Sequence, residues 1–173
     1  MRIATWNVNS VRQRLTPLRA FLRDEAPDVL CLQELKCEDH VFPRGEIEDA
    51  GYNVVVHGQK TFNGVAILSK NPIEETIVGL PGVDGEAQTR AAFQRLLNLG
   101  FTDALRAVTD APGQYTFWDY QAGAWPKNRG LRIDHLLLSP RAADKLKRVE
   151  ICKAMRDGEK PSDHVAIYAD FID

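Results

Sequence analysis

Short runs of apolar and β-branched residues recur through the first half of the chain and predict strands. RIATWNV alternates along its length, DVLCLQ is mostly apolar, and YNVVVH and GVAILS follow. Runs of roughly four to eight such residues are typical of strands, and a mostly apolar run suits a strand buried on both faces. The pattern therefore predicts strands at 2–8, 28–33, 52–57, 64–69 and 73–79.

Helices are predicted where apolar residues recur every three or four positions between capping residues. Leu18, Phe21 and Leu22 form such a stripe behind a Thr-Pro pair that resembles an N-cap followed by a proline in the first turn. The segment AAFQRLLNL has the same period and ends at Gly100, a typical C-cap. The expected helices begin at Thr16, cover 46–50, 91–99 and 103–108, and begin again at Pro140.

The second half of the chain adds the strands 115–120, 131–139, 149–153 and 164–171. Among them LRIDHLLLS has the strongest strand pattern, and YTFWDY is an aromatic run. Strands and helices occur without a fixed-period repeat, and 173 residues suffice for one domain with its own core. We expect one mixed α/β domain over residues 1–173, built from two packed layers of strands.

Composition excludes several classes of protein. Hydrophobic residues make up 44% and charged residues 27%, which is ordinary for a globular protein. No apolar run approaches the ~20 residues that span a membrane, and MRIATWNVNS lacks the features of a signal peptide. Three cysteines without a C-x-x-C pair favour reduced thiols. We therefore expect a cytoplasmic protein with no membrane partner.

The net charge of −2 does not by itself indicate a nucleic-acid partner. A surface that reads phosphates would have to be local, and the best candidates are Lys127, Arg129 and Arg132. The basic residues between 141 and 148 have a simpler explanation as the solvated face of a helix.

Polar side chains interrupt or end several predicted strands, where burial is costly without a partner. They follow the first and second strands, interrupt LRIDHLLLS and open the last strand: Asn7, Asn9, Glu34, Asp134, Asp163 and His164. Each has an ordinary explanation on its own, as a turn residue, a helix-start carboxylate or a paired core acid. Their shared position at strand ends is less easily explained that way.

One chemistry accommodates all of these residues. Carboxylate and amide oxygens suit Mg²⁺ or Mn²⁺, which keeps much of its water shell. A histidine beside a carboxylate is positioned for acid–base work near neutral pH. A cation with such a pair favours phosphoester hydrolysis, because the metal neutralises the phosphate while the pair orients or activates water. No glycine-rich phosphate loop or G-x-S-x-G elbow occurs in the sequence.

Segments in order along nearly the whole chain resemble the motifs of the exodeoxyribonuclease III family, within the endonuclease/exonuclease/phosphatase superfamily. They are TWNVNS, DVLCLQELK, YNVVVHGQK, GVAILSK, TFWDYQAGAW, NRGLRIDHLLLS and EKPSDHVAI. The resemblance implies a four-layered α/β sandwich of two sheets flanked by helices. It also implies a Mg²⁺-dependent hydrolase of DNA base excision repair, with Mn²⁺ as an alternative cofactor. Its expected partner is double-stranded DNA with abasic sites or 3′ ends.

Carried over by position, the resemblance implies a role for each polar residue. Glu34 would be the principal metal ligand, with Asn7 nearby and Asp163 at the metal or its bound water. His164 would bind the scissile phosphate or help to activate the nucleophile, held by a hydrogen bond to Asp134.

The resemblance also implies contacts with DNA. Phe117 and Trp118 would stack against the abasic sugar or neighbouring bases, although two core aromatic residues on a strand explain the same pattern equally well. The other residues expected to contact DNA are Arg90, Asn9, Lys127 and Arg129.

The chain departs from the family pattern between EAQTR and AAFQRLLNLG. The family has there a strand pair, a Y-x-P-N-G motif, a long helix and a buried strand ending in G-D-x-N, and none of these motifs occurs in this sequence. We therefore expect an internal segment to be missing between Arg90 and Ala91. Its loss would remove a tyrosine and an asparagine that hold the phosphate and an aspartate assigned to leaving-group or water chemistry. It would also leave sheet edges open to self-association.

Three functions remain open. The first is a Mg²⁺-dependent DNA-repair phosphodiesterase with endonuclease and exonuclease activity. The second is another chemistry of the superfamily, such as that of a phosphatase or a sphingomyelinase, although TFWDYQAGAW and NRGLRIDHLL favour the nuclease. The third is a catalytically inactive or severely impaired remnant with at most weak DNA or metal binding, which the absence of G-D-x-N favours.

Overall fold

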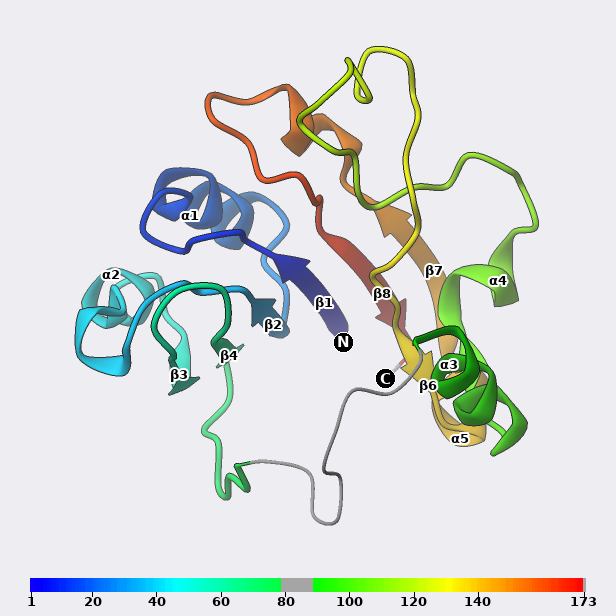
Figure 1. Cartoon of the computed structure of the whole chain (residues 1–173). Helices are drawn as coiled ribbons and strands as arrows, with labels where there is room; N and C mark the ends of the chain where they lie inside the picture. Colours follow the sequence, from blue (N-terminus) through cyan, green and yellow to red (C-terminus); the bar gives the residue numbers. More distant parts are fainter. Residues whose placement is uncertain (79–88, 173) are drawn as a thin grey trace.

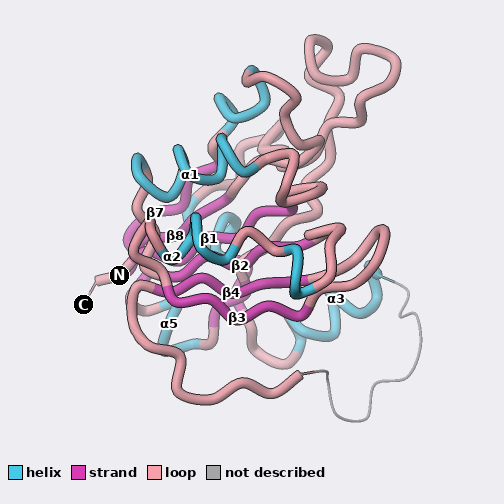
Figure 2. The backbone as a smooth tube through the Cα atoms, turned by 90° about the vertical axis from the view of Figure 1, so that its left-hand side faces the viewer, coloured by secondary structure: helices cyan, strands magenta, loops and turns pink. Residues whose placement is uncertain are grey.

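A six-stranded sheet forms the centre of the protein (Figure 1). The computed structural model describes residues 1–78 and 89–172. The strands follow the order β3-β4-β2-β1-β8-β7, side by side in Figure 2; β1 and β2 pair in parallel and the other neighbours are antiparallel. They are β1 (Arg2–Asn7), β2 (Val29–Gln33), β3 (Asn53–His57), β4 (Val65–Ser69), β7 (Leu146–Ile151) and β8 (Ile167–Phe171).

Helices lie on both sides of this sheet (Figure 1). On one side are α1 (Leu15–Asp24) and α2 (Arg44–Glu48); on the other are α3 (Thr89–Asn98), α4 (Ala104–Val108) and α5 (Pro140–Ala143). Two short 3₁₀ helices are η1 (Asp39–Val41) and η2 (Lys153–Asp157). Among the described residues, no helix combines the length and the apolar composition that crossing a membrane requires.

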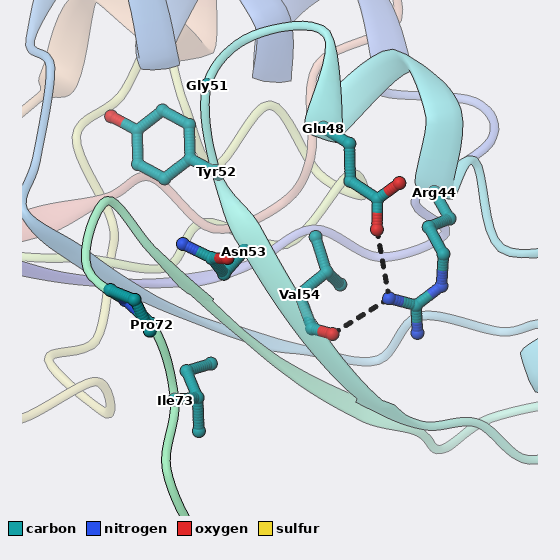
Figure 3. Close-up of a pocket in the computed structure, with 8 residues that line it drawn as sticks. All are labelled: Arg44, Glu48, Gly51, Tyr52, Asn53, Val54, Pro72 and Ile73. Carbon is teal, nitrogen blue, oxygen red and sulfur yellow. Dashed lines mark hydrogen bonds and ion pairs between the residues drawn. The ribbon is translucent and has the colours of Figure 1, made fainter.

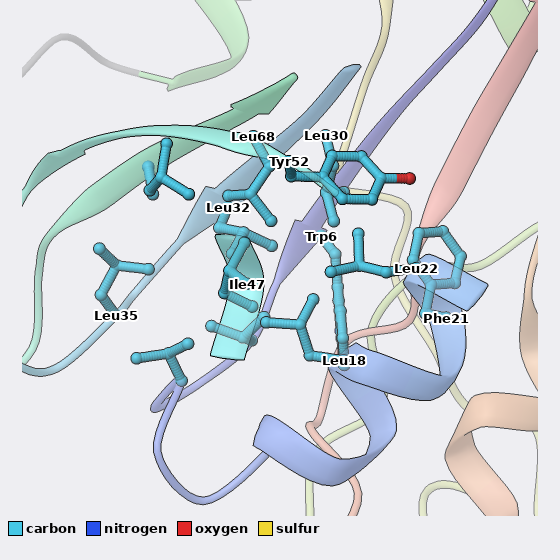
Figure 4. Close-up of a cluster of buried hydrophobic side chains, with 14 of the residues drawn as sticks. Trp6, Leu18, Phe21, Leu22, Leu30, Leu32, Leu35, Ile47, Tyr52 and Leu68 are labelled. Carbon is cyan, nitrogen blue, oxygen red and sulfur yellow. The ribbon is translucent and has the colours of Figure 1, made fainter. Parts of the chain in front are cut away.

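The main core lies between the sheet and the helices α1 and α2 (Figure 4). The predicted stripe of α1 is buried there, and the ring of Phe21 lies 6.2 Å from that of Trp6 in β1. Burying a side chain of this size contributes roughly 1.5–3 kcal/mol. The other large side chains of the main core are Leu18, Leu22, Leu30, Leu32, Leu35, Ile47, Tyr52 and Leu68.

A second, much smaller sheet packs against the first. Its strand β5 (Thr102–Asp103) pairs with β6 (Leu137–Leu138). Leu138 is buried with Ala169 and Phe171 of β8. The protein therefore has two sheets flanked by helices, and the predicted α/β sandwich is confirmed.

One predicted strand is wrong in extent, and two others do not form in the described residues. Within 131–139 only Leu137–Leu138 is a strand, and 115–120 forms only isolated bridges through Phe117. Residues 73–78 form no strand, and Gly79 lies outside the described residues. A strand persists only where a neighbour satisfies its backbone hydrogen bonds, and in the described part of the chain these segments have no continuous neighbour.

One face of β4 is open to solvent. Ala66 and Leu68 point into the main core, whereas the alternate residues Val65 and Ile67 are 49% and 42% exposed. An apolar sheet face needs a second layer to cover it. The second sheet, as far as the structure describes it, is too short to complete the sandwich over this part of the first.

A buried charge cluster stabilises the second sheet. Oδ2 of Asp103 accepts a hydrogen bond from Nη1 of Arg132 at 2.5 Å and lies 3.4 Å from Nδ1 of His135. Burial alone would raise the pKa of Asp103, but its hydrogen bonds with His135 and Arg132 lower that pKa to about 2. Phe93 of α3 packs on His135, with ring centroids 4.3 Å apart. The cluster thus joins α3, β5 and the segment before β6.

We predict that Asp103→Asn lowers the free energy of unfolding at neutral pH by about 2 kcal/mol. Because folding lowers the pKa of Asp103 from 3.8 to about 2, its contribution is present above the unfolded pKa and is lost as the pH falls through the folded one. Denaturant unfolding at several pH values should show that the difference in unfolding free energy between the two chains decreases below about pH 4. A gap that stays constant down to about pH 2 would contradict this account.

Candidate active site

The ends of three central strands meet at one edge of the sheet. β1 and β2 are parallel and pair Asn7 with Gln33, so Glu34 follows directly beside Asn7. β8 runs antiparallel to β1, so the residues that precede it, Asp163 and His164, return to the same edge. This topology brings together side chains from opposite ends of the sequence.

A chain of hydrogen bonds connects four of the predicted residues. Nδ2 of Asn7 donates to Oε1 of Glu34 at 2.8 Å and lies 3.4 Å from Nε2 of His164. On the other side of the ring, Nδ1 of His164 lies 2.7 Å from Oδ2 of Asp134. The predicted hydrogen bond between Asp134 and His164 is therefore confirmed. Because both side chains are buried, the carboxylate fixes the orientation of the imidazole.

Asp163 joins the site through a second set of contacts. Nδ2 of Asn9 donates to Oδ1 of Asp163 at 2.8 Å, and Oδ1 of Asn9 accepts from Nζ of Lys36 at 2.5 Å. The same ammonium lies 3.2 Å from Oε2 of Glu34. In this network Asp163 is connected to Glu34 through Asn9 and Lys36.

Lys36 and Ser162 belong to this network although the sequence predicts no role for them. Oγ of Ser162 donates to the carbonyl oxygen of Asn7 at 2.8 Å and accepts from the backbone N–H of His164 at 3.2 Å. It therefore ties the loop before β8 to the end of β1. The only signal in the sequence is that both residues lie in the segments DVLCLQELK and EKPSDHVAI, next to predicted site residues.

Several residues of the site hold an unfavourable backbone conformation. Asn9, Ser10, Glu34 and Lys36 have φ values of 46°, 86°, 51° and 53°. This left-handed region costs a non-glycine residue on the order of 1–3 kcal/mol, and such residues cluster at functional sites. The loops after β1 and β2 therefore adopt unfavourable backbone conformations that position the side chains of the site.

The two aromatic residues that were predicted to stack on DNA face different surroundings. The ring of Phe117 lies against that of His164, with centroids 4.9 Å apart. Trp118 is wholly buried; its ring packs edge-on against Trp125 and its Nε1 donates to Asn128. The prediction that Trp118 stacks on DNA is wrong, because successive side chains of an extended segment point to opposite faces.

The basic residues that were predicted to contact phosphates also lie in different surroundings. The prediction for Arg132 is wrong, because its guanidinium is bound to Asp103 in the buried cluster. Lys127 and Arg129 are exposed on the loop after Tyr120, where Nζ of Lys127 donates to a backbone carbonyl at 2.9 Å. Arg90 lies in α3, and its side chain is outside the described part of the structure.

The donors at this edge fit a hydrated divalent cation. Glu34 presents a carboxylate with 38% of its side chain exposed, and a second carboxylate, that of Asp163, is connected to it through Asn9 and Lys36. Among the described residues, no three His, Cys, Asp or Glu side chains gather closely enough to form a fuller cage. Mg²⁺ needs only one or two carboxylates, since it keeps several waters. Asn7 turns its amide nitrogen towards Glu34, so Glu34 is the better ligand in this geometry.

A cavity of about 480 Å³ lies between α2, β3 and the residues that follow β4 (Figure 3). Nη1 of Arg44 donates to Glu48 at 3.3 Å and to the carbonyl oxygen of Val54 at 2.8 Å, across one side of this cavity. None of the candidate site residues lines this cavity, so it is separate from the candidate active site. Its lining consists of Arg44, Glu48, Gly51, Tyr52, Asn53, Val54, Pro72 and Ile73.

The chain is similar to known nucleases and to a phosphatase. The sequence model of the Endonuclease/Exonuclease/phosphatase family matches residues 4–104 and 86–164. Exodeoxyribonuclease III of Haemophilus influenzae is 26% identical, in an alignment that covers 99% of this chain and 100% of the relative. The 3′ phosphatase NExo from Neisseria, bound to a product DNA hairpin, is similar in structure, with a TM-score of 0.93, 30% identity and 99% of each chain covered. An AP endonuclease from Archaeoglobus fulgidus has a TM-score of 0.91 and 27% identity, again over 99% of each chain.

The chain is shorter than its Haemophilus influenzae relative. The alignment runs over 266 positions, so at least 93 of them (266 less 173) have no residue in this chain. The two segments matched by the family model overlap over residues 86–104, a range that contains the junction of Arg90 and Ala91. The predicted internal shortening of the chain is therefore confirmed.

We predict that Trp118→Ala lowers the free energy of unfolding by about 3–5 kcal/mol, because it leaves a large cavity in a packed cluster. Phe117→Ala removes a half-buried ring and should cost less. Denaturant unfolding of both variants makes the comparison, and equal losses would contradict the different positions of the two rings.

Proposed function

Because this chain belongs to the Endonuclease/Exonuclease/phosphatase family, we propose that it is a DNA-repair nuclease of the exodeoxyribonuclease III and AP endonuclease type. Its substrate would be double-stranded DNA at abasic sites or 3′ ends. Similarity to an exodeoxyribonuclease III and to an AP endonuclease structure supports this assignment. The observation that carries it is the buried pair of Asp134 and His164, in contact with Asn7 and, through Asn7, with Glu34.

Glu34 would hold Mg²⁺, or Mn²⁺ as the alternative, with Asn7 and Asp163 placed at the metal or its waters. When bound, the cation neutralises the charge of the phosphate under attack. Lys36 adds a positive charge beside Glu34, 3.2 Å from its carboxylate. With the cation in place, this edge of the sheet would attract the anionic DNA backbone although the chain as a whole carries a net charge of −2.

His164 would supply the proton chemistry of the reaction. Its Nδ1 faces the carboxylate of Asp134 and so carries the hydrogen, which leaves Nε2 as the acceptor on the side of Asn7. From that position Nε2 can accept a proton from the attacking water or, once protonated, donate a hydrogen bond to a phosphate oxygen. The carboxylate of Asp134 accepts this hydrogen bond and so would keep the ring in this tautomer.

Phe117 would line the path of the DNA next to this histidine. Its ring packs on His164 and remains partly exposed, so one face is available to an unpaired sugar or base. Asn9, Lys127 and Arg129 would contact the backbone of the duplex.

A DNA 3′-phosphatase is the second candidate function. It is supported by the similarity to the Neisseria 3′ phosphatase. Both reactions hydrolyse a phosphoester and would use the same residues, so they differ in the group that leaves rather than in the site. Parallel assays on a duplex with an abasic site and on a duplex with a 3′-phosphate distinguish the two.

We predict that cleavage of an abasic duplex requires Mg²⁺ and that Glu34→Ala lowers its rate at least about a hundredfold, since a charged contact to the reaction centre is lost. Glu38→Ala is the matched control: Glu38 lies four residues further on and pairs with Lys60 on the surface. Equal rates for the two variants, or full activity in a chelator, would refute the assignment of Glu34.

We also predict that cleavage is at least roughly a thousandfold slower than by the Haemophilus influenzae relative. General acid–base assistance contributes on the order of 10²–10⁴-fold, and this chain lacks the G-D-x-N and Y-x-P-N-G motifs that would carry part of it. The open face at Val65 and Ile67 should also promote self-association, which sedimentation of the purified chain measures. A monomer with activity close to that of the relative would mean that other residues have taken over the lost roles.

A further inference from the structure

Two arginines are buried near the site without an acidic partner. Arg14 is 7% exposed and Arg156 is 8% exposed. Neither takes part in an ion pair among the described residues, and Nε of each has no hydrogen-bond partner there. Burying a charge without a counter-charge is costly, so their positions require an explanation other than stability.

The guanidinium of Arg14 joins the two loops that carry the site. Nη1 donates to the carbonyl oxygen of Asn9, in the loop after β1, and to Oε1 of Gln13. Nη2 donates to the carbonyl oxygen of Pro161, in the loop before β8, at 3.1 Å, and to the hydroxyl of Tyr120 at 3.0 Å. One side chain thus connects the first and last segments of the sheet edge.

The bond to Asn9 falls on a strained peptide. Asn9 and Ser10 both lie in the left-handed region, and the carbonyl that Arg14 binds is between them. A fixed donor at that carbonyl stabilises the turn. This turn conformation directs Nδ2 of Asn9 to Oδ1 of Asp163 at 2.8 Å. Arg14 therefore acts on Asp163 from two sides, through Asn9 and through Pro161, which lies two residues before Asp163.

Tyr120 completes this bridge. Its hydroxyl donates to the carbonyl oxygen of Pro161 at 2.9 Å and lies 3.3 Å from Nδ2 of Asn9. Arg156 lies over the ring of Tyr120, 5.0 Å from its centroid, and donates to the carbonyl oxygen of Trp118. Within the described residues no hydrogen bond of Arg156 reaches Asn9 or Pro161, so Arg156 lacks both of the contacts through which Arg14 binds the loops of the site.

We propose that Arg14 is a positioning residue of the site, whose guanidinium fixes the contact between Asn9 and Asp163 and thereby the position of the Asp163 carboxylate relative to the rest of the site. The inference rests on the proposed function, in which that carboxylate serves the cation. The acceptors around Arg14 lie in different directions, and the planar fork of a guanidinium with its five donors satisfies them where a lysine ammonium does not.

Arg14→Met tests this role, and Arg156→Met is its matched control, because it removes an equally buried guanidinium from the same region. In Arg14→Met we expect the side-chain amide signals of Asn9 to move in ¹⁵N–¹H spectra recorded without metal. We also expect the dissociation constant for Mn²⁺, measured by calorimetry, to rise about tenfold or more, as for other residues that orient a metal ligand. In the cleavage assay kcat should fall more than KM changes. Arg156→Met should change each of these readouts by less, because Arg156 reaches Asn9 and Pro161 only through the ring of Tyr120.

The outcomes separate this inference from the proposed function. Unchanged Asn9 signals and unchanged Mn²⁺ affinity in a folded Arg14→Met chain would overturn the role of Arg14, as would equal changes in the two variants. If the unsubstituted chain neither binds Mn²⁺ nor cleaves DNA, the proposed function fails, and the Asn9 signals still decide the role of Arg14. If Arg14→Met does not fold, Arg14→Lys keeps the charge but not the fork, and the same measurements on that variant decide it.

Discussion

The pairing of β1 with β2 in parallel and with β8 in the antiparallel direction is the constraint on which the site depends. It brings the carboxyl ends of two strands and the amino end of a third to one edge, with Asn7 paired to Gln33. The register is fixed by burial, because Trp6 and Leu32 enter the core under α1 and α2. A slip of one residue would move these side chains to the opposite face and carry Asn7 away with them.

The two halves of the sandwich are unequal, and the site draws on both. Glu34, the proposed cation ligand, stands at the end of strands that are fully paired within the six-stranded sheet. The side that carries Asp134 comes from segments with few sheet bonds. These segments are held by single hydrogen bonds rather than by continuous strand pairing. Oγ1 of Thr116 accepts from the backbone N–H of Asp134 at 3.2 Å, and the backbone N–H of Trp118 donates to the carbonyl oxygen of Asp163 at 2.8 Å. The pair of Asp134 and His164 is therefore held in place although the second sheet is small.

Charge is arranged around this edge in two ways. Lys36 stands among the donors and faces the carboxylate of Glu34, whereas Arg14 and Arg156 are buried and bind backbone carbonyls and Tyr120. Asn9 contacts a cation of each group, Lys36 through its side chain and Arg14 through its carbonyl oxygen, and Glu34 pairs with Lys36. Hydrogen bonds from buried guanidinium groups hold a strained turn such as that at Asn9 firmly, because the donors are rigid and cannot exchange their partners for water.

The sequence by itself determined the elements of the main core and pointed to the residues of the candidate site. Its apolar runs predict β1, β2, β3, β4 and α1 with small errors at their ends, and Asn7, Glu34, Asp134, Asp163 and His164 were named from polar interruptions of strands and from a family resemblance. Tertiary structure decided what pattern leaves open. Phe117 and Trp118 are adjacent and chemically alike, and only packing sends one towards His164 and the other into the core. The segments 115–120 and 131–139 have strand-like sequences but lack continuous partners in the described chain, and strand formation depends on a neighbour that a single segment does not encode. Arg14 reads as an ordinary surface residue until the fold places Pro161 and Tyr120 beside it, because a contact between distant segments leaves no trace in local sequence.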